Sequence, residues 1–191
     1  MCEFYSIYKK DKKWISEPLK RLADYSKIPG VWFVLGKKTN DEDEFICLDV
    51  AETSDIQDEI DTDISYSKMD FDELVKKYGN KYPACNIFGE AMFDCNKNYF
   101  RKCLWAFTKN NYSVLKFVII NKRIEDTGDR RALERYIAFK FDAIHWRDRK
   151  PYIIEGNIER KKQIIDKYCI GFENNNPEYN GLSTAIDNII R

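Results

Sequence analysis

Residues 30–60 read GVWFVLGKKTNDEDEFICLDVAETSDIQDEI, and this stretch decides the fold. Residues 31–35 are a continuous apolar and aromatic run, which predicts a buried strand. The polar segment 36–44 predicts a loop, and residues 45–50 predict a second strand. Two strands joined in this way form an antiparallel hairpin, so we expect a sheet built around it.

A helix is expected directly after this hairpin. Ile56, Ile60 and Ile64 recur every four residues and therefore share one helix face. Thr53 or Ser54 is expected to cap the first turn, because a short side-chain oxygen can accept a hydrogen bond from a free backbone N–H there.

Patterns on either side of this stretch predict the remaining elements. Residues 16–25 are expected to form a helix with Ser16 as its N-cap, and residues 114–120 are the clearest strand. The clearest helix covers residues 129–146. Its expected buried stripe is Leu133, Ile137, Phe141 and Ile144. Further helices are expected over residues 71–79, 99–107, 157–168 and 182–191, with irregular structure over 80–100.

These elements predict a chain of the α/β (α+β) class, with a small, mainly antiparallel sheet flanked by helices. Residues 1–150 are expected to form one domain that includes the N-terminal helix. Residues 151–191 are expected to form a C-terminal helical extension packed on the same domain.

Composition excludes several classes of protein. The 191 residues include 43% apolar and 15% aromatic side chains, enough for a core, and 34% charged side chains. No stretch approaches the ~18 apolar residues of a membrane-spanning helix, and the N-terminus lacks the apolar segment of a secretory signal. We therefore expect a cytoplasmic protein with no membrane partner.

Cysteine and histidine give no sign of a metal or redox site. The six cysteines are scattered without a close pair, so buried or incidental thiols are expected. His145 is the only histidine, which excludes a metal site built on several histidines. No cofactor is certain from these residues.

Charge is distributed unevenly along a chain whose formal net charge is zero. Residues 41–73 hold fourteen acidic side chains and one lysine, a net of −13. Residues 95–167 hold eighteen basic and nine acidic side chains, a net of +9. A basic surface favours phosphate, and an acidic surface attracts basic proteins. Each stretch is also compatible with an ordinary solvated surface.

Two sets of binding residues follow from this charge map. The candidates for binding a basic protein lie on the helix after the hairpin and are Asp55, Asp58, Glu59, Asp61 and Asp63. The candidates for binding nucleic acid lie on and after the helix near residue 134 and are Arg130, Arg131, Arg135, Arg147, Arg149 and Lys150.

The hairpin resembles the opening of the GIY-YIG nuclease family. That family begins with a Gly-x-Tyr strand and returns through a Tyr-x-Gly strand into a helix that carries an arginine. Residues 30–32 (Gly-Val-Trp) stand at the first motif and residues 49–51 (Asp-Val-Ala) at the second. Strand 114–120 is similar to the family's third strand. The helix after it is similar to the one with the metal-binding glutamate, here Glu134.

The resemblance covers about residues 28–147. It implies a tyrosine hydroxyl and an arginine at the scissile phosphate, and one divalent metal on the glutamate. This chain has Trp32 and Asp49 at the two tyrosine positions and Glu59 at the arginine position. Loss of one electrostatic contact to a transition state costs ~10²–10³ in rate. Ordinary catalysis is therefore expected to be lost, and Mg²⁺ on Glu134 is implied only for an active site.

Three functions stay open. The first is a GIY-YIG-like domain that binds nucleic acid, or a nucleic-acid-processing protein, without ordinary catalysis. The second is an active metal-dependent endonuclease with a rearranged site, in which Asp49 lies near Glu134 and another tyrosine supplies the hydroxyl. The candidate tyrosines are Tyr5, Tyr8 and Tyr25. The third is an acidic interaction protein or inhibitor that mimics the charge of nucleic acid.

Overall fold

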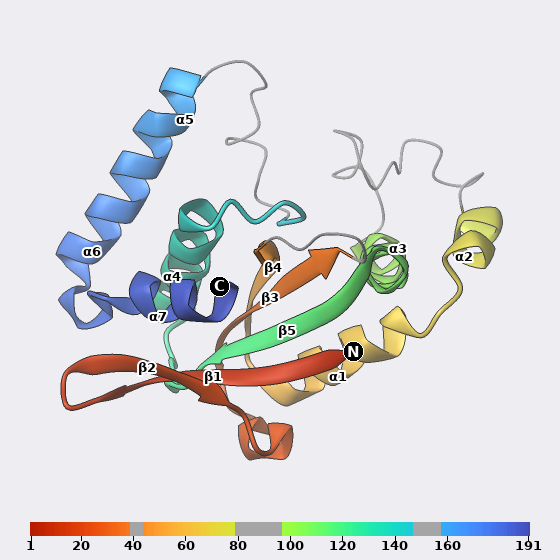
Figure 1. Ribbon diagram of the computed structural model, residues 1–191, viewed down its shortest axis with the longest axis horizontal. Helices are drawn as coiled ribbons and strands as arrows, with labels where there is room; N and C mark the ends of the chain where they lie inside the picture. Colours follow the sequence, from red (N-terminus) through yellow and green to blue (C-terminus); the bar gives the residue numbers. More distant parts are fainter. Residues whose placement is uncertain (39–43, 79–96, 147–157) are drawn as a thin grey trace.

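A five-stranded sheet forms the centre of the computed structural model, which describes residues 1–38, 44–78, 97–146 and 158–191 (Figure 1). The strands are β1 (Cys2–Lys10), β2 (Lys13–Pro18), β3 (Gly30–Lys38), β4 (Ile46–Thr53) and β5 (Tyr112–Ile120). They lie in the order β2-β1-β5-β3-β4, and only β1 and β5 are parallel neighbours. The expected α+β class with a small, mainly antiparallel sheet is confirmed.

The hairpin expected from residues 31–35 and 45–50 is confirmed as β3 and β4. β3 lies between β4 and β5 and is antiparallel to both. Helices cover both faces of the sheet, so this inner strand is buried throughout from Gly30 to Gly36, which explains its continuous apolar sequence. The strand expected at 114–120 is also confirmed and forms most of β5.

The N-terminal segment differs from the expectation. Residues 16–25 do not form a helix, because the chain folds into the β1–β2 hairpin and only Leu22–Tyr25 form a short 3-10 helix, η1. Alternating side chains across the hairpin, such as the facing pair Tyr8 and Ile15, follow the two-residue period of a strand. Asp11 and Lys12 turn the chain with φ values of 48° and 66°.

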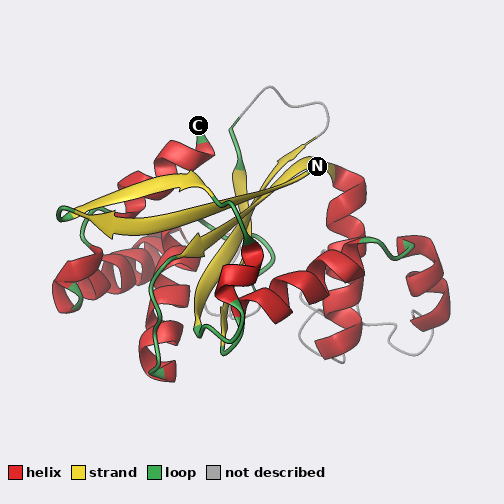
Figure 2. Cartoon of the chain, turned by 90° about the horizontal axis from the view of Figure 1, so that it is seen from below, coloured by secondary structure: helices red, strands yellow, loops and turns green. Residues whose placement is uncertain are grey.

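Two helix layers sandwich the sheet (Figure 2). On one face lie α1 (Ile56–Ser67) and α3 (Lys97–Asn111), with α2 (Phe71–Tyr78) beside α3. On the other face lie α4 (Thr127–Lys140) and α7 (Leu182–Ile190). Alternate residues of β3 divide between the two cores: Trp32 packs with α1 and α3, and Phe33 packs with α4 and α7.

Helix α1 begins one residue later than expected. Its N-cap is Asp55, whose carboxylate accepts a hydrogen bond from the Asp58 N–H at 3.1 Å, and not Thr53 or Ser54. The Thr53 hydroxyl instead accepts a bond from the Asp55 N–H at 3.1 Å. Residues 53–55 are all favourable N-cap residues, because aspartate caps a helix as well as serine does, and the structure uses the last of the three.

Helix α4 ends at Lys140, six residues earlier than expected. Leu133 and Ile137 are buried as expected, but Phe141 and Ile144 are only partly buried. The segment after α4 leaves the helix so that Ile144 and His145 can donate hydrogen bonds to carbonyl groups of β4, at 3.2 and 2.7 Å. These bonds use the outer edge of the terminal strand, which would otherwise be unpaired.

The C-terminal segment, residues 158–191, contributes side chains to the core between α4 and the sheet. It contains α5 (Ile158–Ile165), a π-helical turn (Asp166–Ile170), α6 (Gly171–Asn175), a 3-10 turn (Pro177–Tyr179) and α7. Leu182, Ile186 and Ile189 are buried in the same cluster as Phe33 and Leu133. The helix expected at the end of the chain is confirmed, and the one expected over 157–168 corresponds to α5 and part of the π-helical turn.

The helices expected over 71–79 and 99–107 are present as α2 and α3. The irregular segment expected at 80–100 lies outside the described residues up to residue 96, and residues 97–100 open α3. Most of the expected loop 36–44 also lies outside them. In the part of the chain that the structure describes, no helix is both long and apolar enough to cross a membrane.

Candidate functional site

Two of the nuclease-like positions meet on the sheet face covered by α1 and α3. Trp32 of β3 is 1% exposed, and its indole nitrogen donates a hydrogen bond to Glu59 Oε2 at 3.1 Å. An indole has only this N–H donor and no hydroxyl that could activate water. The contact therefore satisfies the one polar atom of a buried ring.

Arg101 of α3 completes this contact from the neighbouring helix. Its guanidinium lies 3.3 Å from Glu59 Oε1 and 2.5 Å from Asp63 Oδ1, and it also donates to the Glu59 carbonyl oxygen at 3.2 Å. Glu59 and Asp63 are four residues apart on α1, so both carboxylates face the same neighbour. One arginine thus pairs with two carboxylates, and its charged hydrogen bonds go to Asp63 Oδ1 and to the Glu59 carbonyl oxygen.

Asp63 is the most deeply buried carboxylate of this group, at 2% exposed. Burial raises the pKa of its carboxyl to about 7, and hydrogen bonds from Arg101 and from Trp105 act in the opposite direction. Trp105 stacks on Trp32 with ring centroids 6.2 Å apart. We call these five residues, Trp32, Glu59, Asp63, Arg101 and Trp105, the Arg101 cluster.

Asp49 does not belong to the Arg101 cluster. It lies on β4 opposite Val34, next to a bulge in the β3–β4 pairing, and it is half-buried. One of its carboxylate oxygens accepts a hydrogen bond from the Val50 N–H at 2.9 Å. The structure gives this side chain a local role at the bulge.

Glu134 lies in the helix layer on the opposite face of the sheet. Its Oε1 accepts a hydrogen bond from the Trp146 indole at 2.9 Å, which ties α4 to the segment that follows it. Trp32 and Glu59 are therefore brought together, whereas the glutamate of the nuclease-like helix stands apart from them. Trp32 and Glu59 meet on one face, and neither Asp49 nor Glu134 joins them, so the four nuclease-like positions do not converge.

A metal site around Glu134 finds no support in the donor set. Within the described ranges, no group of three or more histidine, cysteine, aspartate or glutamate side chains is placed to hold a metal ion. Of the tyrosines named as substitutes, Tyr8 bonds to Glu17 and Tyr25 packs in the core with Trp32. Tyr5 packs against the core on the α4 face, and its hydroxyl donates to Glu3 at 3.3 Å.

The candidate nucleic-acid residues on α4 are only partly available. Arg130 is buried and bonds to Glu52 and to the carbonyl oxygens of Ile124 and Glu125, so its expected role on the surface is wrong. Arg131 is exposed and lies 3.4 Å from Glu52. Arg135 is also exposed. Arg147, Arg149 and Lys150 lie outside the described residues.

The acidic candidates on α1 divide into two groups. Asp58 and Asp61 are exposed, and Asp55 is the partly buried N-cap. Glu59 and Asp63 point inward to Arg101, so the expectation that most of these carboxylates face solvent is wrong for them. Helical periodicity explains the split, because Glu59 and Asp63 lie beside the buried Ile56 and Ile60.

The β1–β2 turn presents a basic group that the charge count over 41–73 and 95–167 did not cover. Residues 9–13 read Lys-Lys-Asp-Lys-Lys, and all five are exposed. We call this segment the lysine turn. It lies at the end of the β1–β2 hairpin, away from the helices of the α1–α3 layer (Figure 1). A run of lysines between two alternating segments, EFYSIY and WISEP, is the sequence signal that identifies it.

The lysine turn is anchored at its base. The Lys9 ammonium and the Trp14 indole both donate to the Glu178 carbonyl oxygen, at 2.8 and 3.1 Å. Trp14 also stacks on Tyr179, with ring centroids 5.6 Å apart. The three remaining lysines, Lys10, Lys12 and Lys13, have no polar partner among the described residues.

Comparisons of this chain with family models, with curated proteins and with solved structures find no match.

Proposed function

We propose that this protein binds nucleic acid without cleaving it, as a GIY-YIG-like domain whose nuclease positions have been rebuilt. The observation that carries the proposal is the lysine turn, which places four lysines within five exposed residues at the end of an anchored hairpin. Asp11 offsets one of these charges, so the turn carries a net charge of +3.

Such a turn suits a phosphate backbone. A lysine that neutralises a phosphate releases condensed counterions, and this release contributes most of the affinity of non-specific binding. A two-stranded ribbon also fits the major groove of a duplex, whereas its exposed face can follow a single strand. The stack of Trp14 on Tyr179 supports this role, because it fixes the direction of the hairpin before binding.

The Arg101 cluster supports the absence of cleavage. A phosphate placed beside Trp32 would face the negative charge of Glu59 and would find no hydroxyl. Arg101 is occupied by two carboxylates, so it does not replace the arginine that the family uses at this place. Electrostatic stabilisation of the transition state would therefore be missing from this position.

The order of the central elements supports the GIY-YIG relation within this proposal. The β3–β4 hairpin runs into α1, and β5 runs into α4, with β3 paired between β4 and β5. That is the order of strands and helices that the resemblance implies. The separation of Glu134 and Asp49 from Trp32 and Glu59 counts against this relation and favours a second candidate, an acidic interaction protein without nuclease ancestry.

A fluorescence anisotropy assay tests the proposal on the full chain. Labelled single-stranded DNA, duplex DNA and RNA are titrated with the protein at about 50 and about 200 mM salt. The test variant replaces Lys10, Lys12 and Lys13 by glutamine. The control variant replaces Lys68, Lys76 and Lys109 by glutamine. These exposed lysines lie on the side of the sheet covered by α1 and α3, and their replacement removes the same positive charge.

The test variant, in which the three lysines of the lysine turn are glutamine, is expected to bind at least about tenfold more weakly. The slope of the logarithm of its affinity against the logarithm of the salt concentration is expected to fall in magnitude by roughly 2–3. The control is expected to change little. Equal losses in both variants would mean diffuse attraction, and no binding by the parent chain would reject the proposal. In that second case the exposed Asp58 and Asp61 would make a basic protein the next partner to test.

A further inference from the structure

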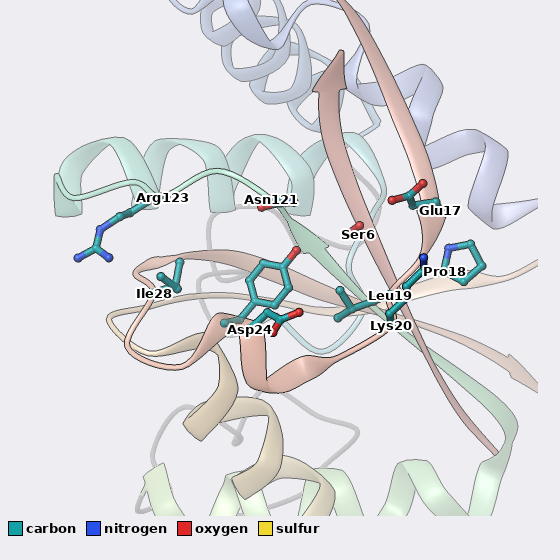
Figure 3. Close-up of a pocket in the computed structure, with 10 residues that line it drawn as sticks. Ser6, Glu17, Pro18, Leu19, Lys20, Asp24, Ile28, Asn121 and Arg123 are labelled. Atoms are coloured by element: carbon teal, nitrogen blue, oxygen red, sulfur yellow. The ribbon is translucent and has the colours of Figure 1, made fainter.

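A pocket of about 370 Å³ lies beside the β1–β2 hairpin, between the end of β2, η1 and the segment after β5 (Figure 3). Its volume is near the lower end of the range for small-ligand pockets, which suits a ligand of the size of one nucleotide. The Arg101 cluster contributes none of its lining residues.

The pocket has apolar walls suited to a flat ring. Pro18, Leu19 and Ile28 line it together with the side chain of Tyr25, which is 6% exposed. Tyr25 closes the inner wall, and the more exposed Pro18, Leu19 and Ile28 offer the surface on which the face of a base can lie. These walls suit the flat face of a ring, and the remaining lining residues are polar or charged.

Polar groups line the same pocket. Ser6, which is 4% exposed, lines the pocket beside Tyr25. The side chain of Asn121 lines the pocket and has no hydrogen-bond partner among the described residues. A carboxamide offers a donor beside an acceptor, which matches the alternating donors and acceptors along the edge of a base.

The charges at the pocket separate a nucleotide from a simple anion. Lys20 and Arg123 lie at opposite ends of it (Figure 3), where either could meet a phosphate. Glu17 and Asp24 also line it, so a small anion inside would meet two carboxylates as well as the two cations. A neutral base inside, with its phosphate at the rim, satisfies this mixed charge.

The pocket is continuous with the lysine turn along one face of the hairpin. Facing pairs two residues apart share a face of a sheet, and the pairs Ser6–Glu17, Tyr8–Ile15 and Lys10–Lys13 follow in this way. The face runs roughly 13 Å from the pocket to the turn at ~3.3 Å per residue. Tyr8 and Ile15 provide a partly buried aromatic and aliphatic surface between the two ends.

We infer that this pocket holds one unpaired nucleotide of the strand whose backbone the lysine turn contacts, with its base against Pro18, Leu19 and Ile28 and within reach of the Asn121 carboxamide. The inference rests on the proposed function and gives it a ligand class: nucleic acid with at least one unpaired base. A fully paired duplex would reach the turn but would leave the pocket empty.

The pocket can be tested without an oligonucleotide. A 5′-mononucleotide, ribose 5-phosphate and inorganic phosphate are titrated separately while the side-chain amide signals of the asparagines are followed by NMR. The mononucleotide is expected to shift the Asn121 signal, and the other two ligands are not. Asn121→Ala is expected to abolish mononucleotide binding, whereas Asn110→Ala, a change at an exposed asparagine of α3, leaves it intact. Equal responses to ribose 5-phosphate, or no response to the mononucleotide, would overturn the inference.

A second experiment separates this inference from the proposed function. A duplex with one unpaired nucleotide is compared with the fully paired duplex, and the unpaired one is expected to bind about tenfold more tightly. Asn121→Ala is expected to remove this preference, and the lysine-turn variant is expected to weaken both duplexes. If lysine-dependent binding shows no preference, the pocket inference is wrong and the proposed function stands. If mononucleotide binds but the lysine variant changes nothing, the link to the turn is overturned and the proposed function fails.

Discussion

The Trp32 indole donates a hydrogen bond to Glu59 at 3.1 Å, and these two residues stand where the GIY-YIG resemblance places a tyrosine and an arginine. The exchange reverses the electrostatics of the position. A hydroxyl and a guanidinium attract a phosphate, whereas an indole bound to a carboxylate leaves a negative charge there. Arg101 balances this charge from α3, so the position is stable as an internal contact.

The first prediction is that the full chain cleaves neither DNA nor RNA. Plasmid, single-stranded DNA and RNA are each incubated with the protein in Mg²⁺ and in Mn²⁺, and products are expected at background level, because the transition-state contacts are missing. Cleavage that persists through purification and disappears in Glu134→Ala would contradict this and would favour a rearranged active site.

The second prediction concerns the stability of the Arg101 cluster. Arg101→Met leaves Asp63, which is 2% exposed, without its charged partner. At about pH 8, above the pKa of about 7, the free energy of unfolding is expected to fall by about 2–4 kcal/mol, because a buried carboxylate that loses its partner is strongly destabilising. Chemical denaturation measures the change, and adding Asp63→Asn to the same chain is expected to recover part of it.

Arg21→Met is the matched control for this variant. Arg21 pairs with Asp24 at 2.6 Å, but its side chain is 73% exposed, so its loss is expected to cost no more than ~1 kcal/mol. Equal effects of the two substitutions would show that the Arg101 cluster behaves as a surface ion pair.

The third prediction is a pH dependence of stability from Asp63. Burial raises the pKa of its carboxyl from 3.8 to about 7, so between these values the folded chain keeps a proton that the unfolded chain has released. This group therefore contributes its full stability below about pH 4, and the contribution is lost as the pH rises through about 7. Glu59, Arg101 and Trp105 are the neighbouring groups that modify this titration.

Asp63→Asn removes this titration. Between pH 4 and 7.5 the stability of the parent chain is expected to fall relative to the variant, by an amount on the order of 2–4 kcal/mol. Asp61→Asn, an exposed change on the same helix, is expected to run parallel to the parent. Parallel curves for Asp63→Asn would show that this carboxyl is ionised throughout the range.

The fourth prediction tests the contribution of the C-terminal helix to the core. Ile186 of α7 is fully buried in the cluster with Phe33 and Leu133, so Ile186→Ala is expected to lower the free energy of unfolding by about 2–5 kcal/mol. Ile170, in the same segment, is 55% exposed, and Ile170→Ala is expected to change it by less than ~1 kcal/mol. A small effect at Ile186 would mean that this helix packs only loosely on the sheet.

The central hairpin and the strand β5 could be predicted from the sequence because their short, continuous apolar runs between polar segments are typical of buried strands. The first hairpin was harder to predict, since charged residues run through the ends of both strands and only Asp11 and Lys12 separate them. Helix propensity in residues 16–25 then suggested a helix, although cross-strand pairs such as Tyr8 and Ile15 hold that region in the sheet.

The Arg101 cluster shows why the site could be predicted only in part. The positions of Trp32 and Glu59 follow from the hairpin and the helix after it, and the structure brings the two together. Their neutralisation by Arg101, 42 residues beyond Glu59, depends on how α3 packs against α1. No local sequence pattern encodes that packing. From the sequence alone, Glu59 is therefore predicted to be a surface carboxylate that would repel a phosphate.

The last prediction separates the shape of the lysine turn from its charge. Lys12 has a φ of 66°, in the left-handed region that glycine adopts without strain, and it occupies a central position of a two-residue turn. Lys12→Gly is therefore expected to raise the free energy of unfolding by about 0.5–1 kcal/mol. The same change is expected to weaken nucleic-acid binding and to lower the salt slope by roughly 0.9, because one phosphate contact is lost. Lys12→Gln keeps the backbone strain and removes only the charge, so it is expected to weaken binding equally with no gain in stability. Denaturation and anisotropy titration of the two variants measure both quantities. If Lys12→Gly binds as tightly as the parent chain, the lysine makes no contact with phosphate, and the turn is only a strained connection between β1 and β2.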